Sequence, residues 1–257
     1  MAKPVGPSGP GFVSGRLTSE TAASDWKHLL DMSFYKRLGV NTLVAIVFSF
    51  WAGAVNTVAT LSILFERASH VSGRVNDIGM NLVLDPIDAL LVFLIWVGFC
   101  FGGYLAGKMV DRIGYTKSLI MVALGIAIGG LLVRAGGYAV DGDDYGVGRM
   151  LFAFYMPITM GIQNGITTLT PHIGRTTHWT GDSTDLGLAF ARGDSPYAIH
   201  NVLKIFGFIA GAAVFGYIVG MIEIPGENSI YMIAIGFLVT TIIFHLMNQY
   251  RAKSAKS

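Results

Sequence analysis

The stretch from Gly53 to Gly79 occurs twice in this chain. Read without gaps against residues 161–187, at a constant offset of 108 positions, it repeats glycine, polar and charged residues. The identical pairs are Gly53/Gly161, Asn56/Asn164, Thr60/Thr168, Leu61/Leu169, Arg67/Arg175, His70/His178, Gly73/Gly181, Asp77/Asp185 and Gly79/Gly187. Apolar sequence matches itself by accident in Leu, Val and Ala, but not in Arg, His, Asp and Gly. We therefore predict a duplicated structural unit.

The composition indicates an integral membrane protein. Hydrophobic residues make up 53% of the 257 residues and charged residues only 13%, with a mean hydropathy of +0.57. A soluble domain with an ordinary surface is less apolar than this. The net charge of +2 and the lack of a basic stripe with interleaved aromatic residues argue against a nucleic-acid partner.

Six apolar stretches are each about long enough to cross a ~30 Å hydrocarbon core as a helix. They cover roughly residues 38–64, 89–110, 118–135, 150–169, 202–222 and 229–250. We assign residues 38–250 to the transmembrane domain and residues 251–257 to a C-terminal tail. The N-terminal tail, residues 1–37, contains a short amphipathic helix, Asp25–Arg37, which we expect at the membrane surface.

The distribution of Lys and Arg predicts the orientation in the membrane. Basic residues gather in the N-terminal tail, in the loop after the second span and in the C-terminal tail: Lys3, Arg16, Lys27, Lys36, Arg37, Lys108, Arg112, Lys117, Arg251, Lys253 and Lys256. The opposite loops hold fewer, and Asp141, Asp143 and Asp144 lie among them. By the positive-inside bias, both termini are cytoplasmic.

With this orientation, the two copies of the repeat have opposite topology. We therefore predict an all-α integral membrane fold of six transmembrane helices, arranged as two inverted three-helix repeats of about residues 38–137 and 146–250. Broken or re-entrant segments are expected after the first and fourth helices, at Gly73, Gly79, Gly181 and Gly187. The matched pairs Gly98/Gly207, Gly102/Gly211 and Gly107/Gly216 are expected to let helices pack closely.

The polar residues in and beside the repeat are candidates for a substrate or proton pathway. They are Asn56, Arg67, His70, Asp77, Gln163, Asn164, Arg175, His178 and Asp185. Ionisable residues at membrane depth are costly and tend to mark such pathways. A pseudo-two-fold axis in the membrane plane would bring His70 and His178 together near the centre, with the two aspartates beside them.

A purely structural role is the alternative for the same residues. Arg67 is then an interfacial residue, His70 a hydrogen-bonded histidine and Asp77 a helix cap, retained twice because the folded unit needs them. We predict no metal site and no cofactor, because the histidines lack a tight ligand spacing such as H-x-x-x-H. Enzymatic activity is not expected either, since no G-x-S-x-G motif is present.

Residues 107–117 fit the pattern G-x-x-x-D-R-x-G-x-x-K between the second and third spans. This loop resembles the cytoplasmic loop signature of the major facilitator superfamily, in which the acidic and basic residues tie helix ends together and bias a conformational equilibrium. The resemblance implies a gating role for Asp111, Arg112 and Gly114. A tight cytoplasmic turn is the alternative.

Three blocks together resemble the DUF1275 (YoaK-like) family of bacterial inner-membrane proteins. They are M-G-I-Q-N at 160–164, R-T-T-H-W-T-G at 175–181 and G-D-S-T-D-L-G at 181–187. The family's first block usually reads H-M-T-G-N, whereas residues 70–74 read H-V-S-G-R, so arginine replaces its asparagine. The resemblance covers roughly residues 38–250. It implies a six-helix protein of the bacterial inner membrane without an established activity.

Two functions are compatible with these observations. The first is a small secondary transporter or permease that moves a small solute or ion through a site between the two repeats. The second is a non-catalytic accessory subunit that packs against a larger membrane complex and binds lipid or pigment there. Ionisable pairs facing a central cavity would favour the transporter, and the same residues in interhelical salt bridges without a cavity would favour the subunit. Membrane lipids are partners in either case.

Overall fold

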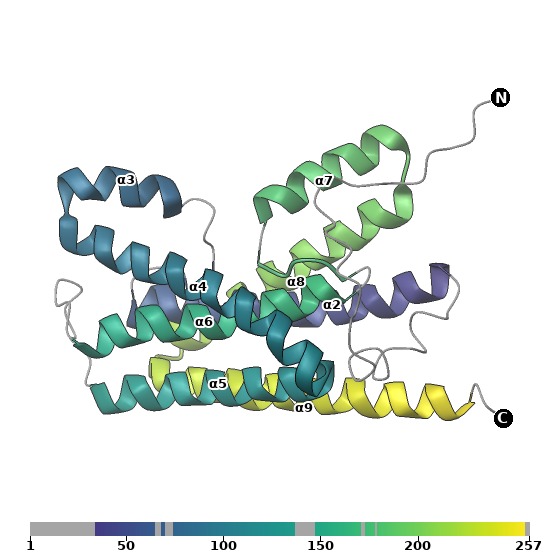
Figure 1. Cartoon of the computed structure of the whole chain (residues 1–257). Helices are drawn as coiled ribbons and strands as arrows, with labels where there is room; N and C mark the ends of the chain where they lie inside the picture. Colours follow the sequence, from purple (N-terminus) through teal and green to yellow (C-terminus); the bar gives the residue numbers. More distant parts are fainter. Residues whose placement is uncertain are drawn as a thin grey trace.

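The computed structural model describes residues 34–64, 68–69, 74–136, 147–170, 173–177 and 179–254. These residues form helices and contain no β-strand, so the predicted all-α class is confirmed (Figure 1). In chain order the elements are α2 (Phe34–Val58), the π-helical turn η1 (Ala59–Ile63), α3 (Arg74–Leu84), α4 (Pro86–Ile113), α5 (Tyr115–Gly136), α6 (Val147–Leu169), α7 (Trp179–Arg192), α8 (Ser195–Gly220) and α9 (Gly226–Ser254).

Five of the described segments are long and apolar enough to cross a membrane. They are Thr42–Ile63, Pro86–Ile113, Tyr115–Ala135, Pro196–Gly220 and Gly226–Met247, and they match five of the six predicted spans. The predicted span at 150–169 forms helix α6 but is not among them. Polar residues such as Thr159, Gln163 and Asn164 lower its hydropathy. Because α6 packs against both α4 and α5, protein rather than lipid covers these side chains.

Helices α4 and α8 begin at equivalent caps. The Asp85 carboxylate accepts hydrogen bonds from the backbone N–H groups of Ile87 and Asp88, each at 3.1 Å, and Pro86 follows at the first helical position. Asp194 caps α8 in the same way, with Tyr197 N–H as donor at 3.2 Å. The sequence-based starts at residues 89 and 202 are therefore several residues late, because capping turns are polar and do not register as apolar span.

Glycines bring α4 against α6 and α8 against α2. A Cβ atom added to Gly102 of α4 would lie 2.1 Å from the Ile158 carbonyl oxygen of α6, and one added to Gly211 of α8 would lie 1.9 Å from that of Phe50 in α2. Phe50 and Ile158 are again 108 positions apart. The same contact recurs one turn earlier. An added Cβ on Gly98 would lie 2.5 Å from the Phe154 carbonyl oxygen, and one on Gly207 would lie 2.5 Å from that of Ile46. The two halves thus use the same helix crossing.

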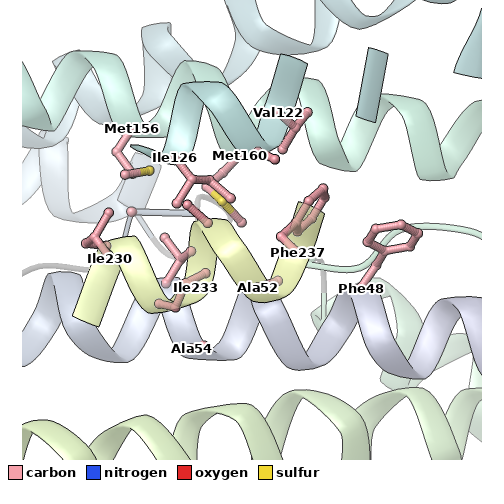
Figure 2. Close-up of a cluster of buried hydrophobic side chains, with 14 of the residues drawn as sticks. Phe48, Ala52, Ala54, Val122, Ile126, Met156, Met160, Ile230, Ile233 and Phe237 are labelled. Carbon is pink, nitrogen blue, oxygen red and sulfur yellow. The ribbon is translucent and has the colours of Figure 1, made fainter. Parts of the chain in front are cut away.

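The apolar core lies where α2, α5, α6 and α9 meet (Figure 2). Phe48 of α2 packs against Phe237 of α9, with ring centroids 5.1 Å apart. Met156 and Met160 of α6 lie on the other side of the same cluster. These side chains come from both halves of the sequence, so the halves share one core and are not separate domains.

The helix ends alternate between the two ends of the bundle (Figure 1). Helix α2 begins and α9 ends at the right of the view, whereas α5 ends and α6 begins at the left. Helix α3 lies beside the start of α4 at the left end, and α7 lies beside the start of α8 at the right end. The two short helices are therefore placed at opposite ends of the bundle.

Candidate functional site

The repeated asparagines each hold the following segment back against its own helix. Asn56 of α2 donates from Nδ2 to Ser69 Oγ at 2.7 Å, and its Oδ1 accepts from Ser69 N–H at 2.9 Å. In the second half, Asn164 Oδ1 accepts from Thr176 N–H and from Thr177 Oγ, both at 3.0 Å. Ser69 and Thr177 are 108 positions apart, like the asparagines. The chain therefore folds back alongside α2 and α6 at equivalent places.

Three of the four glycines predicted as helix breaks lie inside helices. Gly79 lies inside the continuous helix α3, and Gly181 and Gly187 lie inside α7, so this prediction was wrong for all three. Gly79 and Gly187 have nothing within 4 Å of an added Cβ, so no close backbone approach requires them. Asn56 and Asn164 hold the segments that precede these short helices. Gly73 lies outside the described residues.

The structure locates only some of the predicted ionisable residues. Asp77 of α3 pairs with Arg74 at 3.2 Å within its own helix, and Asp185 of α7 is exposed. Arg175 is exposed too, next to the Thr176 that Asn164 binds. Arg67, His70 and His178 lie outside the described residues, so the predicted approach of the two histidines stays a prediction.

The loop between α4 and α5 is a tight turn. Gly114 has a φ of 80° and its N–H donates to the Val110 carbonyl at 3.0 Å, which closes α4. Asp111 and Arg112 on the last turn of α4 are exposed. The Tyr115 hydroxyl, at the start of α5, donates to the Leu169 carbonyl at the end of α6 at 3.0 Å. The turn therefore anchors the ends of three helices, and its gating role stays a prediction.

A buried ion pair joins α7 to α8. Lys204 Nζ lies 2.8 Å from Asp182 Oδ2, and the two side chains are 2% and 9% exposed. The indole of Trp179 lies beside the ammonium, with Nζ 5.9 Å from the ring centroid. Gly174, at a φ of 75°, leaves its backbone next to Nζ, where an added Cβ would be 3.8 Å away. Burial raises the pKa of the Asp182 carboxyl, and the neighbouring ammonium opposes that shift.

His200 lies one helical turn before Lys204 and connects the two halves of the chain. Its Nδ1 is 2.9 Å from Thr42 Oγ of α2, and its Nε2 is 3.2 Å from the Ile173 carbonyl. Tyr197 stacks on the imidazole, with ring centroids 6.4 Å apart and an interplanar angle of 9°. His200 is 2% exposed. The ion pair therefore lies beside the interface between α8 and α2.

The ion pair has no counterpart in the first half. When α4 and α8 are aligned by their crossing glycines, Lys204 corresponds to Ile95 and His200 to Leu91. The constant offset of the repeat aligns Asp182 with Arg74. Leu91 and Ile95 are fully buried apolar residues. The duplicated scaffold thus carries a buried charge pair on one side only. Packing alone does not explain the difference, because the apolar version of the same position also packs well.

Gln163 contributes a second polar contact between the halves. Its Nε2 donates to the Phe48 carbonyl of α2 at 2.9 Å, in a fully buried position. Its Oε1 and the neighbouring Ser49 Oγ are buried without a hydrogen-bond partner among the described residues. This contact lies beside the aromatic core around Phe48.

Sequence reasoning placed Asn56, Gln163 and Asn164 in the site and did not select Lys204, Asp182 or His200. The available signal was Lys204 itself, a lysine inside the predicted span 202–222. An ionisable residue within an apolar span is a site candidate in its own right. The repeat does not indicate Lys204, because this lysine has no equivalent in the first half.

Comparison with known proteins gives a family but no activity. No curated protein and no solved structure matches the chain. The family model described as "Protein of unknown function (DUF1275)" matches residues 44–243. That range includes the repeated asparagines, the helix crossings and the ion pair, and it covers well over half of the chain. The chain therefore belongs to the DUF1275 family.

Proposed function

We propose that this protein is a small secondary transporter or permease whose site lies around Lys204 and Asp182. The buried ion pair carries the proposal, because Lys204 lies within a segment apolar enough to span a membrane. A buried ion pair is seldom more stabilising than well-packed apolar residues of the same volume. Ionisable residues in such segments tend to mark substrate or ion pathways.

The place of the pair supports a site between the two halves. Lys204 and His200 lie on one face of α8, four positions apart, and His200 contacts Thr42 of α2. Helix α8 belongs to the second half and α2 to the first. A movement of one half relative to the other would therefore disturb the His200–Thr42 contact, one helical turn from Lys204.

We further propose that the six helices α2, α4, α5, α6, α8 and α9 form two inverted three-helix repeats in the membrane. The equivalent crossings at Gly102 and Gly211 and the equivalent folding-back at Asn56 and Asn164 support this plan. Helix α6 would be the sixth span, tolerated despite its polar residues because protein covers them. The segments held by the two asparagines would be the re-entrant parts.

The orientation proposed for this plan places both termini in the cytoplasm of a bacterium, with the protein in its inner membrane. Reporter fusions after Asp143 and at the C-terminus are expected to report opposite sides, because one lies between the third and fourth spans and the other follows the sixth. Paired enzymatic reporters, one active only in the cytoplasm and one only in the periplasm, would measure this. The same side for both fusions would contradict the inverted plan.

An accessory subunit is the second candidate, favoured by an aromatic face on α4. The ring centroids of Phe93 and Trp96 are 5.9 Å apart. Those of Phe101 and Tyr104 are 6.2 Å apart, and these two rings are nearly parallel. All four side chains are exposed on the isolated chain. Such a face would suit packing against a larger complex, lipid or pigment. The ion pair joins two helices, α7 and α8, which is also compatible with an accessory subunit.

Uptake by the purified protein in liposomes tests the transporter directly. We expect at least one member of a panel of labelled small ions and solutes to accumulate above the level of empty liposomes. The matched control is the double variant Lys204→Met with Asp182→Leu, which removes both charges together and should retain the fold. Uptake by the double variant should fall to the empty-liposome level. Wild-type uptake by this variant would exclude the ion pair as the site, whereas no uptake by the wild-type protein would favour the accessory subunit.

A further inference from the structure

The groups around Lys204 offer more hydrogen-bond donors than acceptors. Trp179 Nε1 and Asn201 Nδ2 are both buried and have no acceptor in hydrogen-bonding geometry among the described residues. Asn201 precedes Lys204 by three positions, so the two side chains share a face of α8. The Trp179 ring lies beside the ammonium. Unsatisfied buried donors are costly and require an explanation.

Asp182 neutralises Lys204 without satisfying these donors. Its Oδ2 lies 2.8 Å from Nζ and accepts from neither the Trp179 indole nor the Asn201 amide. Other charges nearby are Asp185 on α7 and the exposed Arg175, which act on both members of the pair. Asp182 therefore balances the charge of Lys204, while the Trp179 and Asn201 donors stay without an acceptor among the described residues.

We infer that the site takes a small carboxylate or similar oxyanion, which replaces Asp182 on the Lys204 ammonium. This inference deepens the proposed function and rests on it. A ligand with several acceptor oxygens would satisfy the ammonium, the indole N–H and the amide together. Because Lys204 is only 2% exposed, we expect a free small anion as the ligand rather than the headgroup of a membrane lipid.

Charge balance then gives a role to Asp182. With an anionic ligand on Lys204, the site would contain two anions for one buried cation, which is costly in an apolar environment. A hydronium ion that gives its proton to the released Asp182 carboxylate and leaves as water restores neutrality, with one O–H bond broken and one formed. The groups facing Asp182 are Lys204 and Tyr197 of α8, Asp185 of α7 and Arg175 of the preceding segment. Anion binding is thus coupled to proton uptake.

Entry of the ligand requires α7 to separate from α8. Helix α7 packs mainly against α8 among the described helices. Beyond the ion pair, its contact includes the edge-to-face packing of Trp179 on Phe208, with centroids 4.7 Å apart. Displacing Asp182 removes its ion pair with Lys204, which joins α7 to α8. The ligand that takes its place would therefore also release the helix that covers it.

Thermal unfolding of the purified full-length protein, with sodium acetate or its neutral analogue acetamide as the probe, tests the inference. We expect acetate to raise the unfolding temperature and acetamide to have no effect. Because a proton accompanies the anion, the acetate affinity should rise by up to ~10-fold for each unit that the pH falls. The substitution Trp179→Phe keeps the ring but removes the donor, and it should raise the acetate Kd about 10-fold.

Three controls make the result specific. Trp51→Phe removes an indole that donates to Thr240 at 3.2 Å, away from the site, and should leave the acetate Kd unchanged. Lys204→Gln, where it folds, should abolish the acetate effect. Micelles containing phosphatidylglycerol should not compete with acetate, and competition would assign the site to lipid instead.

Equal effects of acetate and acetamide, or an unchanged acetate Kd in Trp179→Phe, would overturn the inference. These results differ from a failure of the transporter proposal. If the protein binds acetate as expected but moves no solute in liposomes, the anion-site inference stands and the transporter proposal fails. If the protein transports a solute but does not bind acetate, the anion-site inference alone fails.

Discussion

Replacing Lys204 by methionine is expected to lower the free energy of unfolding by about 3–5 kcal/mol. The substitution removes the ammonium and leaves the carboxylate of Asp182, whose side chain is 9% exposed, without its cation. An uncompensated charge in a buried position is among the costliest single changes to a protein. Chemical unfolding in detergent micelles, followed by far-UV circular dichroism, would measure the loss.

The double variant Lys204→Met with Asp182→Leu tests the cause of that loss. Removing both charges leaves an apolar contact of similar volume, so most of the lost stability should return, to within ~1 kcal/mol of the wild type. Asp77→Asn is the matched control for a less buried pair, because the Arg74 and Asp77 side chains are 14% and 32% exposed, and it should cost less than ~1 kcal/mol. Equal losses in the single and double variants would contradict this account of the pair.

Gly211→Ala is expected to be the second most damaging change, at about 1–3 kcal/mol or more. The new Cβ would lie 1.9 Å from the carbonyl oxygen of Phe50, and both partners of the clash are helix backbone. No side-chain rotation can relieve it, so α8 must move away from α2. Gly102→Ala should have an equal effect, because its Cβ would lie 2.1 Å from the Ile158 carbonyl. The unfolding assay described for Lys204 applies here as well.

Gly103→Ala provides the control for the helix crossing. Gly103 is the neighbour of Gly102 in α4 but has nothing within 4 Å of an added Cβ. Alanine is the better helix former by about 1 kcal/mol, so this variant should be as stable as the wild type or slightly more stable. If Gly211→Ala were as stable as Gly103→Ala, the close approach of α8 and α2 would not limit stability.

The duplicated asparagines were predictable as equivalent positions from the sequence alone. Asn56 and Asn164 share their offset with Ser69 and Thr177, so each asparagine binds the equivalent hydroxyl residue, although the backbone donor is Ser69 N–H in one half and Thr176 N–H in the other. Each interaction spans only 12 or 13 positions of the chain, and a duplicated segment of that length carries both partners. The error concerned where the chain turns, because glycine permits a break and does not cause one.

The sequence by itself determined the helical class and the positions of the apolar spans. A run of apolar residues of membrane length can satisfy its backbone groups only as a helix, whatever its neighbours are. The matched glycines were likewise predicted as packing positions, and Gly98, Gly102, Gly207 and Gly211 lie at helix crossings. The prediction was wrong for the third pair, because Gly107 has nothing within 4 Å of an added Cβ and Gly216 has only a Thr57 methyl group at 3.7 Å. Which helix each glycine contacts was decided by the tertiary structure.

Only the tertiary structure decided the partner of Lys204. Lys204 and Asp182 are on different helices, and they meet because α7 folds back along α8. Spacing along the chain does not encode such a meeting, because it depends on the path of the segment between Asn164 and Trp179. The same holds for His200 and Thr42, which are 158 positions apart. The apolar pattern specifies which residues leave water, whereas the partner of a buried charge is specified by how the helices pack.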